Sequence, residues 1–320
     1  MTSTPSRSAA ARVRMAARWV SRFPFTVALT LALLLIAVLT GTHLTPLAHL
    51  PWYDTVATGL PAFRHGRWWT VATAPWFVTH PLRFLLALPL TIGAVGWAEA
   101  KFGSLRSLGL FAAGHLVGVL GGAATIAIAS ARGGPWALGV SHALGVGPTS
   151  GALACLVFAA ATLPSPWRLR ARFAIGAWAA IGLVYLGHLI NVERAVVFVA
   201  ALAVSGMLPA FRHPAGRPTI REWRLLGFAW LIVIGVVEVF NLIPFNGPIG
   251  RNSPFLPVGD VLLDVAVIAI VAHGVRLGIR AAWIGTLVLS AVNVLTAFVL
   301  ALLVPVLEEA GYVDGADDLL

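Results

Sequence analysis

The chain has 320 residues, of which 59% are hydrophobic and 11% are charged, and its mean hydropathy is +0.89. Because a soluble globular chain carries about 25% charged residues, this composition excludes most soluble enzymes. The formal charge of +10 comes from 22 basic against 12 acidic residues. The basic residues stand in short clusters between long apolar runs, which indicates a membrane and not a nucleic acid as the partner.

The apolar runs predict an all-α polytopic membrane protein. A hydrocarbon core about 30 Å thick requires roughly 17 to 25 apolar residues per helix, and about nine runs approach this length. The predicted spans are 25–43, 82–98, 107–129, 145–163, 173–187, 195–211, 225–243, 261–276 and 281–305. Residues 44–81 are rich in tryptophan and interrupted by prolines, so they are predicted to form a long interfacial loop.

The distribution of basic residues predicts the orientation of these spans. With a cytoplasmic amino terminus, sixteen of the 22 basic residues fall inside and five outside, which agrees with the positive-inside rule. We therefore expect a multi-pass protein of the cell membrane with an extracytoplasmic carboxyl terminus.

The domain boundary is predicted where proline, glycine and arginine concentrate, at 212–224. The predicted domains are a basic cytoplasmic amino terminus at 1–24, a six-helix bundle at 25–211, a cytoplasmic linker at 212–224, a three-helix membrane unit at 225–305 and an acidic tail at 306–320.

The densest polar signal is the run 146–154, at the outer end of the fourth predicted span. Ser150, followed by Gly151, would expose its hydroxyl there, and the free amides of a helix start can hold an oxyanion. A serine nucleophile needs a base, and His188 follows the fifth span on the same side. Three alternatives stay open: small residues that only pack helices together, a His188 that only caps a helix end, and His142 as the neighbour of the serine.

Other residues within the predicted spans suggest close packing of helices or a role in transport. Gly114, Gly118 and Gly122 form a small-residue stripe that predicts close helix packing. Arg83, near the outer end of the second span, either reaches the headgroups, pairs with an anion or faces a cavity. The acids Glu238, Asp260 and Asp264 could line an outward polar cleft of a transporter or simply hydrogen-bond neighbouring helices.

The order of these features resembles the rhomboid superfamily of intramembrane serine proteases over about residues 66–208. The resemblance rests on four motifs, which are Gly66-Arg67-Trp68-Trp69-Thr70, Glu99 with Gly103 and Arg106, the glycines from Gly118 to Gly122, and Thr149-Ser150-Gly151-Ala152. It implies a six-helix bundle with Ser150 as nucleophile and His188 as base. The chain departs from the family where Arg83 and Ala87 replace the oxyanion donors, Pro148 replaces a glycine, and Arg194 competes for the base position. These departures imply a degenerate site.

A second resemblance covers nearly the whole chain. It is to the multi-span amino-terminal region of actinobacterial lysyl-phosphatidylglycerol synthase-like proteins, through the segments 22–25, 66–69, 165–168, 221–224 and 237–248. It implies a non-catalytic module that binds anionic or aminoacylated phospholipid, and we expect no synthase domain in this chain.

Three functions therefore remain open. The lipid-binding module would use Arg83, Thr149, Gly151, His142 and Arg194. An intramembrane serine endopeptidase would use Ser150 and His188 on a transmembrane protein substrate. A transporter would use the three acids of spans seven and eight. No cofactor or metal site is predicted, because the sequence has no cofactor motif or metal cluster and its single cysteine, Cys155, lies in an apolar run. No nucleic-acid partner is predicted, because the basic residues form no continuous stripe.

Overall fold

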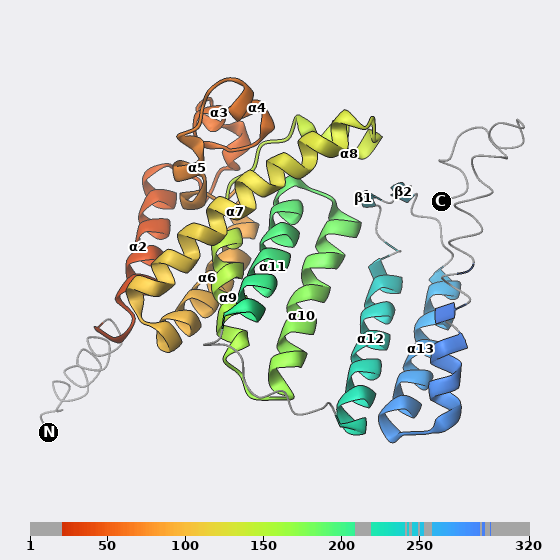
Figure 1. The fold of residues 1–320 in the computed structure, drawn as a ribbon. Coiled ribbons are helices and arrows are strands. Elements are labelled where there is room, and N and C mark those ends of the chain that lie inside the picture. Colours follow the sequence, from red (N-terminus) through yellow and green to blue (C-terminus); the bar gives the residue numbers. More distant parts are fainter. Residues whose placement is uncertain are drawn as a thin grey trace, which may run out of the picture. The chain divides into compact units, whose positions relative to one another are not determined.

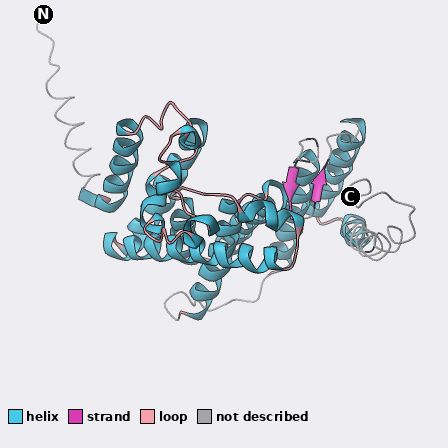
Figure 2. Cartoon of the chain, turned by 90° about the horizontal axis from the view of Figure 1, so that it is seen from above, coloured by secondary structure: helices cyan, strands magenta, loops and turns pink. Residues whose placement is uncertain are grey.

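The computed structural model describes residues 21–208, 219–240, 242, 245–248, 250–252, 258–288, 290, 291 and 295. The regular secondary structure of these residues is helical, apart from a pair of short strands (Figure 2). The chain forms two compact units, residues 1–179 with 188–213 and residues 180–187 with 214–320. The predicted all-α class holds except for this small hairpin.

Unit 1 contains most of the long apolar helices, although the last part of one of them, residues 180–187, belongs to unit 2. Within the described residues, four helical segments are long and apolar enough to cross a membrane: α6 (Pro81–Phe102), α7 (Ser104–Ala131), α10 (Trp167–Ile181) continued by the π-helical turn η3 (Gly182–Leu186), and α11 (Leu189–Met207). Leucines such as Leu85 and Leu86 are 67% and 77% exposed on α6. Helices that are long, apolar and outwardly leucine-rich indicate a multi-pass membrane protein.

Two apolar helices are shorter than predicted. Helix α2 (Pro24–Leu39) has 16 residues and α9 (Thr149–Ala161) has 13. At 1.5 Å per residue, α9 measures about 20 Å, which is less than a hydrocarbon core. The fourth predicted span, 145–163, is therefore wrong in its amino-terminal part, where residues 145–148 precede the helix.

Helix α9 is the centre of unit 1. Twelve of its thirteen residues are buried, and it packs against α6, α7 and α11 (Figure 1). The glycine stripe of α7 explains this close contact. A Cβ on Gly114 would overlap the Cβ of Ala154, and a Cβ on Gly118 would lie 2.9 Å from the Cβ of Ser150. The predicted role of the stripe in helix packing is confirmed.

The segment between α2 and α6 forms a group of short helices at the end of unit 1 where α9 begins (Figure 1). They are η1 (Leu47–His49), α3 (Tyr53–Val56), α4 (Leu60–Arg64), α5 (Thr70–Thr73) and η2 (Ala74–Trp76). Helix α8 (Pro135–Ser141), which was not predicted, lies at the same end.

This group of short helices holds the strand-like segment that precedes Ser150. Thr58 and Gly145 form an antiparallel bridge, with the Thr58 amide 2.9 Å from the Gly145 oxygen and the return bond at 2.7 Å. The Tyr53 hydroxyl donates to the Leu144 oxygen at 2.9 Å, and the Gly147 amide donates to the Ala74 oxygen at 3.0 Å. These hydrogen bonds attach the segment just before α9 to the group of short helices, which fixes the position of the first turn of α9.

At the other end of unit 1, Glu99 of α6 caps the start of α2. Its carboxylate accepts hydrogen bonds from the amides of Phe25 and Thr26, both at 2.8 Å, and from the hydroxyls of Thr26 and Ser104, both at 2.6 Å. The amides at a helix start have no partner within the helix, so a carboxylate there accepts their hydrogen bonds. Its negative charge also interacts favourably with the positive end of the helix dipole.

Unit 2 contains α12 (Ile220–Phe240), α13 (Val258–Leu277) and the hairpin of β1 (Phe245–Gly247) and β2 (Gly250–Asn252). Thr219 and Glu222 form a capping box at the start of α12, with bonds of 2.7 and 3.3 Å. Residues 220–224 of the predicted linker thus belong to α12.

The ninth predicted span, 281–305, is helical at every residue of it that the structure describes, 281–288, 290, 291 and 295, and its other residues lie outside the described ones. The tail 306–320 and residues 1–20 also lie outside them.

Candidate functional site

The hydroxyl of Ser150 is bound by a carboxylate. Ser150 is the second residue of α9 and is fully buried, and its Oγ donates to Oε2 of Glu193 on α11 at 3.1 Å. Glu193 is itself 5% exposed and packs on Gly122, where a Cβ would lie 2.8 Å from its Cγ. The observed partner of Ser150 is thus an acid, whereas the predicted dyad required an imidazole.

The neighbouring residues make a second contact between the same two helices. Arg194 of α11 donates to Oγ1 of Thr149 from Nε at 3.3 Å and from Nη2 at 3.1 Å, and to Oδ1 of Asn191 from Nη1 at 3.3 Å. Its Cζ lies 5.0 Å from the ring centroid of Trp178 on α10. Consecutive residues of α9 therefore bind consecutive residues of α11.

The guanidinium of Arg194 has only neutral hydrogen-bond partners within the described residues. Glu193 is close enough for its charge to act on Arg194, but its carboxylate accepts from Ser150. Arg83 at the start of α6 is also close enough for its charge to act on Arg194. A half-buried cation without a bound carboxylate is costly in a membrane protein and marks a place where an anion would be stabilised.

Arg83 and His188 are neighbours, and the charge of Arg83 acts on both His188 and Arg194. Both side chains are exposed, and Arg83 makes one long hydrogen bond of 3.5 Å to Thr79. Partial burial of the His188 ring, together with the positive charge of Arg83, lowers the pKa of His188 below its ordinary value. His188 precedes α11, and its side chain makes no hydrogen bond to any described residue, Ser150 included.

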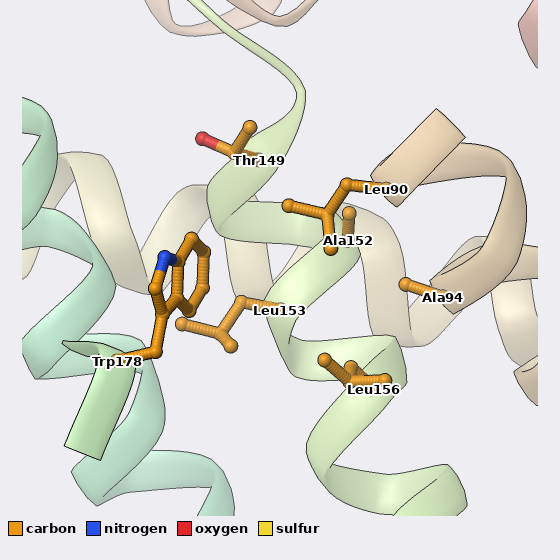
Figure 3. A pocket seen from close by; sticks show the side chains of 7 residues that line it. All are labelled: Leu90, Ala94, Thr149, Ala152, Leu153, Leu156 and Trp178. Carbon is orange, nitrogen blue, oxygen red and sulfur yellow. The ribbon is translucent and has the colours of Figure 1, made fainter. Parts of the chain in front are cut away.

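A shallow, open apolar depression, without enclosed space for a water molecule, adjoins Arg194. It is lined by Leu90, Ala94, Thr149, Ala152, Leu153, Leu156 and Trp178. Figure 3 shows Thr149 at one end of the depression, with Trp178 of α10 on one side and Leu90 and Ala94 of α6 on the other. Because Thr149 and Trp178 also contact Arg194, the site places a cation at one end of an apolar surface.

The other predicted residues of this group have different surroundings. Gly151 packs against Phe111 of α7, where a Cβ would lie 2.6 Å from the Phe111 oxygen. Its role there is close packing. His142 ends α8 and is exposed, and its side chain makes no hydrogen bond within the described residues. His115 is buried, and its Nε2 lies 2.9 Å from the oxygen of Val71, so it joins α7 to α5.

The three acids of unit 2, predicted to line one cleft, differ in what the structure describes of them. Glu238 is half-buried on α12 and is close enough to Tyr185 for its charge to act on the phenol. Asp264 is exposed on α13. The side chain of Asp260 lies outside the described ones, so the polar cleft stays a prediction.

Glu193, Asn191 and Trp178 are site residues that the sequence reasoning missed. The sixth span was predicted to begin at 195, which left Glu193 and Arg194 in a loop, whereas α11 begins at Leu189. The sequence did indicate these residues, because Glu193 and Arg194 stand side by side at the edge of an apolar run, and charged groups are rarely buried in a membrane protein without a role.

The arrangement favours binding over nucleophilic catalysis. A serine nucleophile needs an accessible hydroxyl beside a base that can take its proton. Ser150 is fully buried and its hydroxyl is held by Glu193. Within the described residues, no three His, Cys, Asp or Glu side chains gather in a way that could hold a metal ion.

No known protein family, no curated protein and no solved structure matches this chain. The resemblances to rhomboids and to the membrane region of lysyl-phosphatidylglycerol synthase-like proteins therefore stay predictions from the motifs.

Proposed function

We propose that this chain is a membrane-embedded helical module that binds an anionic phospholipid and does not act as a serine protease. The phosphate lies against Arg194 and Arg83, and an acyl chain lies on the depression between α6, α9 and α10. The observation that carries the proposal is the guanidinium of Arg194, bound to Thr149 and stacked on Trp178 at the end of an apolar surface.

The charges of the site support an anionic headgroup. In the absence of a ligand the positive charge of Arg83 acts on both Arg194 and His188, and guanidinium groups bind phosphate oxygens with paired hydrogen bonds. The lining below Thr149 is apolar apart from the Trp178 indole. A phospholipid has both parts in this order, a charged phosphate followed by a hydrocarbon chain.

The same charges predict a preference between lipids. Lysyl esterification adds two ammonium groups to the headgroup of phosphatidylglycerol and makes its net charge positive, and these charges would meet Arg83 and Arg194. We therefore expect the protein to bind phosphatidylglycerol more tightly than either lysyl-phosphatidylglycerol or the neutral phosphatidylcholine.

The test is lipid retention by the purified protein, measured by native mass spectrometry during titration with each lipid. Arg194→Gln and Arg83→Gln should each weaken phosphatidylglycerol binding by about tenfold, because each removes a charge-assisted hydrogen bond worth about 1.5 kcal/mol. Arg83→Gln is the safer variant for folding, since Arg83 is exposed.

The matched control is Arg132→Gln, which removes the same charge at the end of α7. Arg132 is exposed and its side chain makes no hydrogen bond within the described residues. The proposal fails if all three variants bind phosphatidylglycerol equally, or if the wild type does not distinguish it from phosphatidylcholine.

A further inference from the structure

A second group of arginines lies at the opposite end of unit 1, where α9 ends and α10 begins. Arg168 and Arg172 are four residues apart on α10, so their side chains share one face of the helix. They are close enough for their charges to repel. Both are half-buried, so water screens this repulsion less than at an open surface.

Arg172 is positioned by α11. Its Nη2 donates to Oγ of Ser205 at 3.2 Å, and the Ser205 hydroxyl in turn donates to the Leu202 oxygen at 3.0 Å. Ser205 is 1% exposed. The Nε of Arg172 is buried and has no hydrogen-bond partner. The guanidinium is thus fixed by one neutral bond and keeps unused donors.

No carboxylate in the part of the chain that the structure describes pairs with these two arginines. Within the described residues, neither Arg168 nor Arg172 forms an ion pair, and Arg168 makes no side-chain hydrogen bond. Two adjacent cations on a fixed face, with donors to spare, match the geometry of a phosphate group, which accepts hydrogen bonds at several oxygens.

The same end of α10 carries an aromatic side chain typical of a membrane interface. Trp167 is 59% exposed, and the Cζ of Arg170 lies 4.8 Å from the centroid of its ring. Exposed tryptophans gather at the headgroup level of a bilayer. The exposed Trp167 therefore predicts the headgroup level at this end of α10, close in sequence to Arg168 and Arg172.

We propose that Arg168 and Arg172 bind a phosphate group, supplied by an anionic phospholipid of the leaflet opposite to the one that serves Arg194. This site is independent of the proposed function, because it shares no residue with the Arg194 site and lies at the other end of the same helices. The protein would then hold one anionic lipid in each leaflet.

Native mass spectrometry with phosphatidylglycerol tests the second site on the whole chain. The wild type should retain two lipids, and Arg168→Gln/Arg172→Gln should lose one of them, with at least tenfold weaker binding at that site. The matched control is Lys101→Gln/Arg106→Gln, which removes two exposed charges near the turn between α6 and α7, at the same end. Equal losses in the two double variants, or no loss in the first, would overturn the proposal.

Two further variants keep the result interpretable. Arg168→Gln alone leaves the Arg172 to Ser205 bond in place, so it should fold and still weaken binding several-fold. Arg168→Lys/Arg172→Lys keeps the charges and should retain most of the binding. Arg194→Gln should lose the other lipid only, so the two sites can fail separately.

Inorganic phosphate distinguishes the source of the phosphate group. Millimolar phosphate should compete weakly with phosphatidylglycerol, because it lacks the anchoring chains. If phosphate raises the melting temperature of the wild type but not of Arg168→Gln/Arg172→Gln, and no second lipid is retained, the lipid source is wrong.

Discussion

At the scale of single residues, the site is two hydrogen-bonded pairs that differ in chemistry. Ser150 with Glu193 is a buried, closed pair, and Thr149 with Arg194 leaves a cation at the edge of an apolar surface. The closed pair joins helices, and the open pair is the one that can receive a ligand. The sequence identified Ser150, Thr149 and Arg194 as candidates, but it could not assign their partners, because 43 to 45 residues separate the members of each pair.

The residue-scale prediction concerns His188 and pH. In the free protein its pKa is lowered by partial burial and by Arg83, so the ring is neutral near pH 7. A bound phosphate favours the protonated ring, so phosphatidylglycerol affinity should rise several-fold as the pH falls from 7.5 to 5.5. Without lipid, the stability of the folded protein should change in the opposite direction to the lipid affinity. Because the pKa of His188 is lower in the folded state, its contribution to stability is present above the pKa of the unfolded state and is lost as the pH falls through the pKa of the folded state.

The measurements are lipid titrations and melting temperatures at both pH values. His188→Gln should remove the pH dependence of binding and leave the binding at pH 7.5 nearly unchanged. His142→Gln, at the same end of the bundle, should behave like the wild type. A pH dependence that persists in His188→Gln would assign it to another group.

At the scale of elements, α7 decides how closely the core helices approach. Its glycine stripe was readable from the sequence, because residues four apart share a helix face. The partners of the stripe were not readable, because a small residue specifies that something lies close without specifying what. The structure places Ala154 and Ser150 of α9, and Glu193 of α11, against Gly114, Gly118 and Gly122.

The element-scale prediction compares two glycines of α7. Gly114→Ala should destabilise the protein by about 1 to 3 kcal/mol, because the new methyl group would overlap the Cβ of Ala154 in a packed core. Gly109→Ala should be neutral or stabilise by about 0.5 to 1 kcal/mol, since nothing lies within 4 Å of a Cβ there and alanine favours the helix.

Thermal unfolding in detergent checks this pair of variants. The two substitutions are identical in chemistry and differ only in their surroundings, so equal melting temperatures would mean that α7 and α9 are not packed as described.

At the scale of the whole molecule, the described chain is a set of apolar helices with charged groups at both ends. Four helices are long enough to span a bilayer, and the central α9 is shielded by its neighbours and reaches only part of the way. The bias of basic residues predicts which of these ends faces the cytoplasm.

Cysteine labelling tests the predicted orientation. Lys101 lies in the last turn of α6, and Arg132 directly follows α7. Both side chains are exposed. In intact cells an impermeant maleimide should label Arg132→Cys, whereas Lys101→Cys should react only after permeabilisation. The wild type is the control, since Cys155 is fully buried and should not react. The reverse pattern would invert the orientation, and labelling of both from outside would contradict the span assignment.

The sequence by itself determined the class of the protein, most helix positions and the residues worth attention. Hydropathy reports burial in a membrane through local composition, and glycine spacing reports a helix face through local periodicity. Only the tertiary structure decided that Glu193 holds Ser150, that Arg194 lies beside Thr149 and Trp178, and that Glu99 caps α2. These are contacts between helices distant in the chain, and they depend on the rotation and depth of each helix, which packing sets and no local pattern encodes.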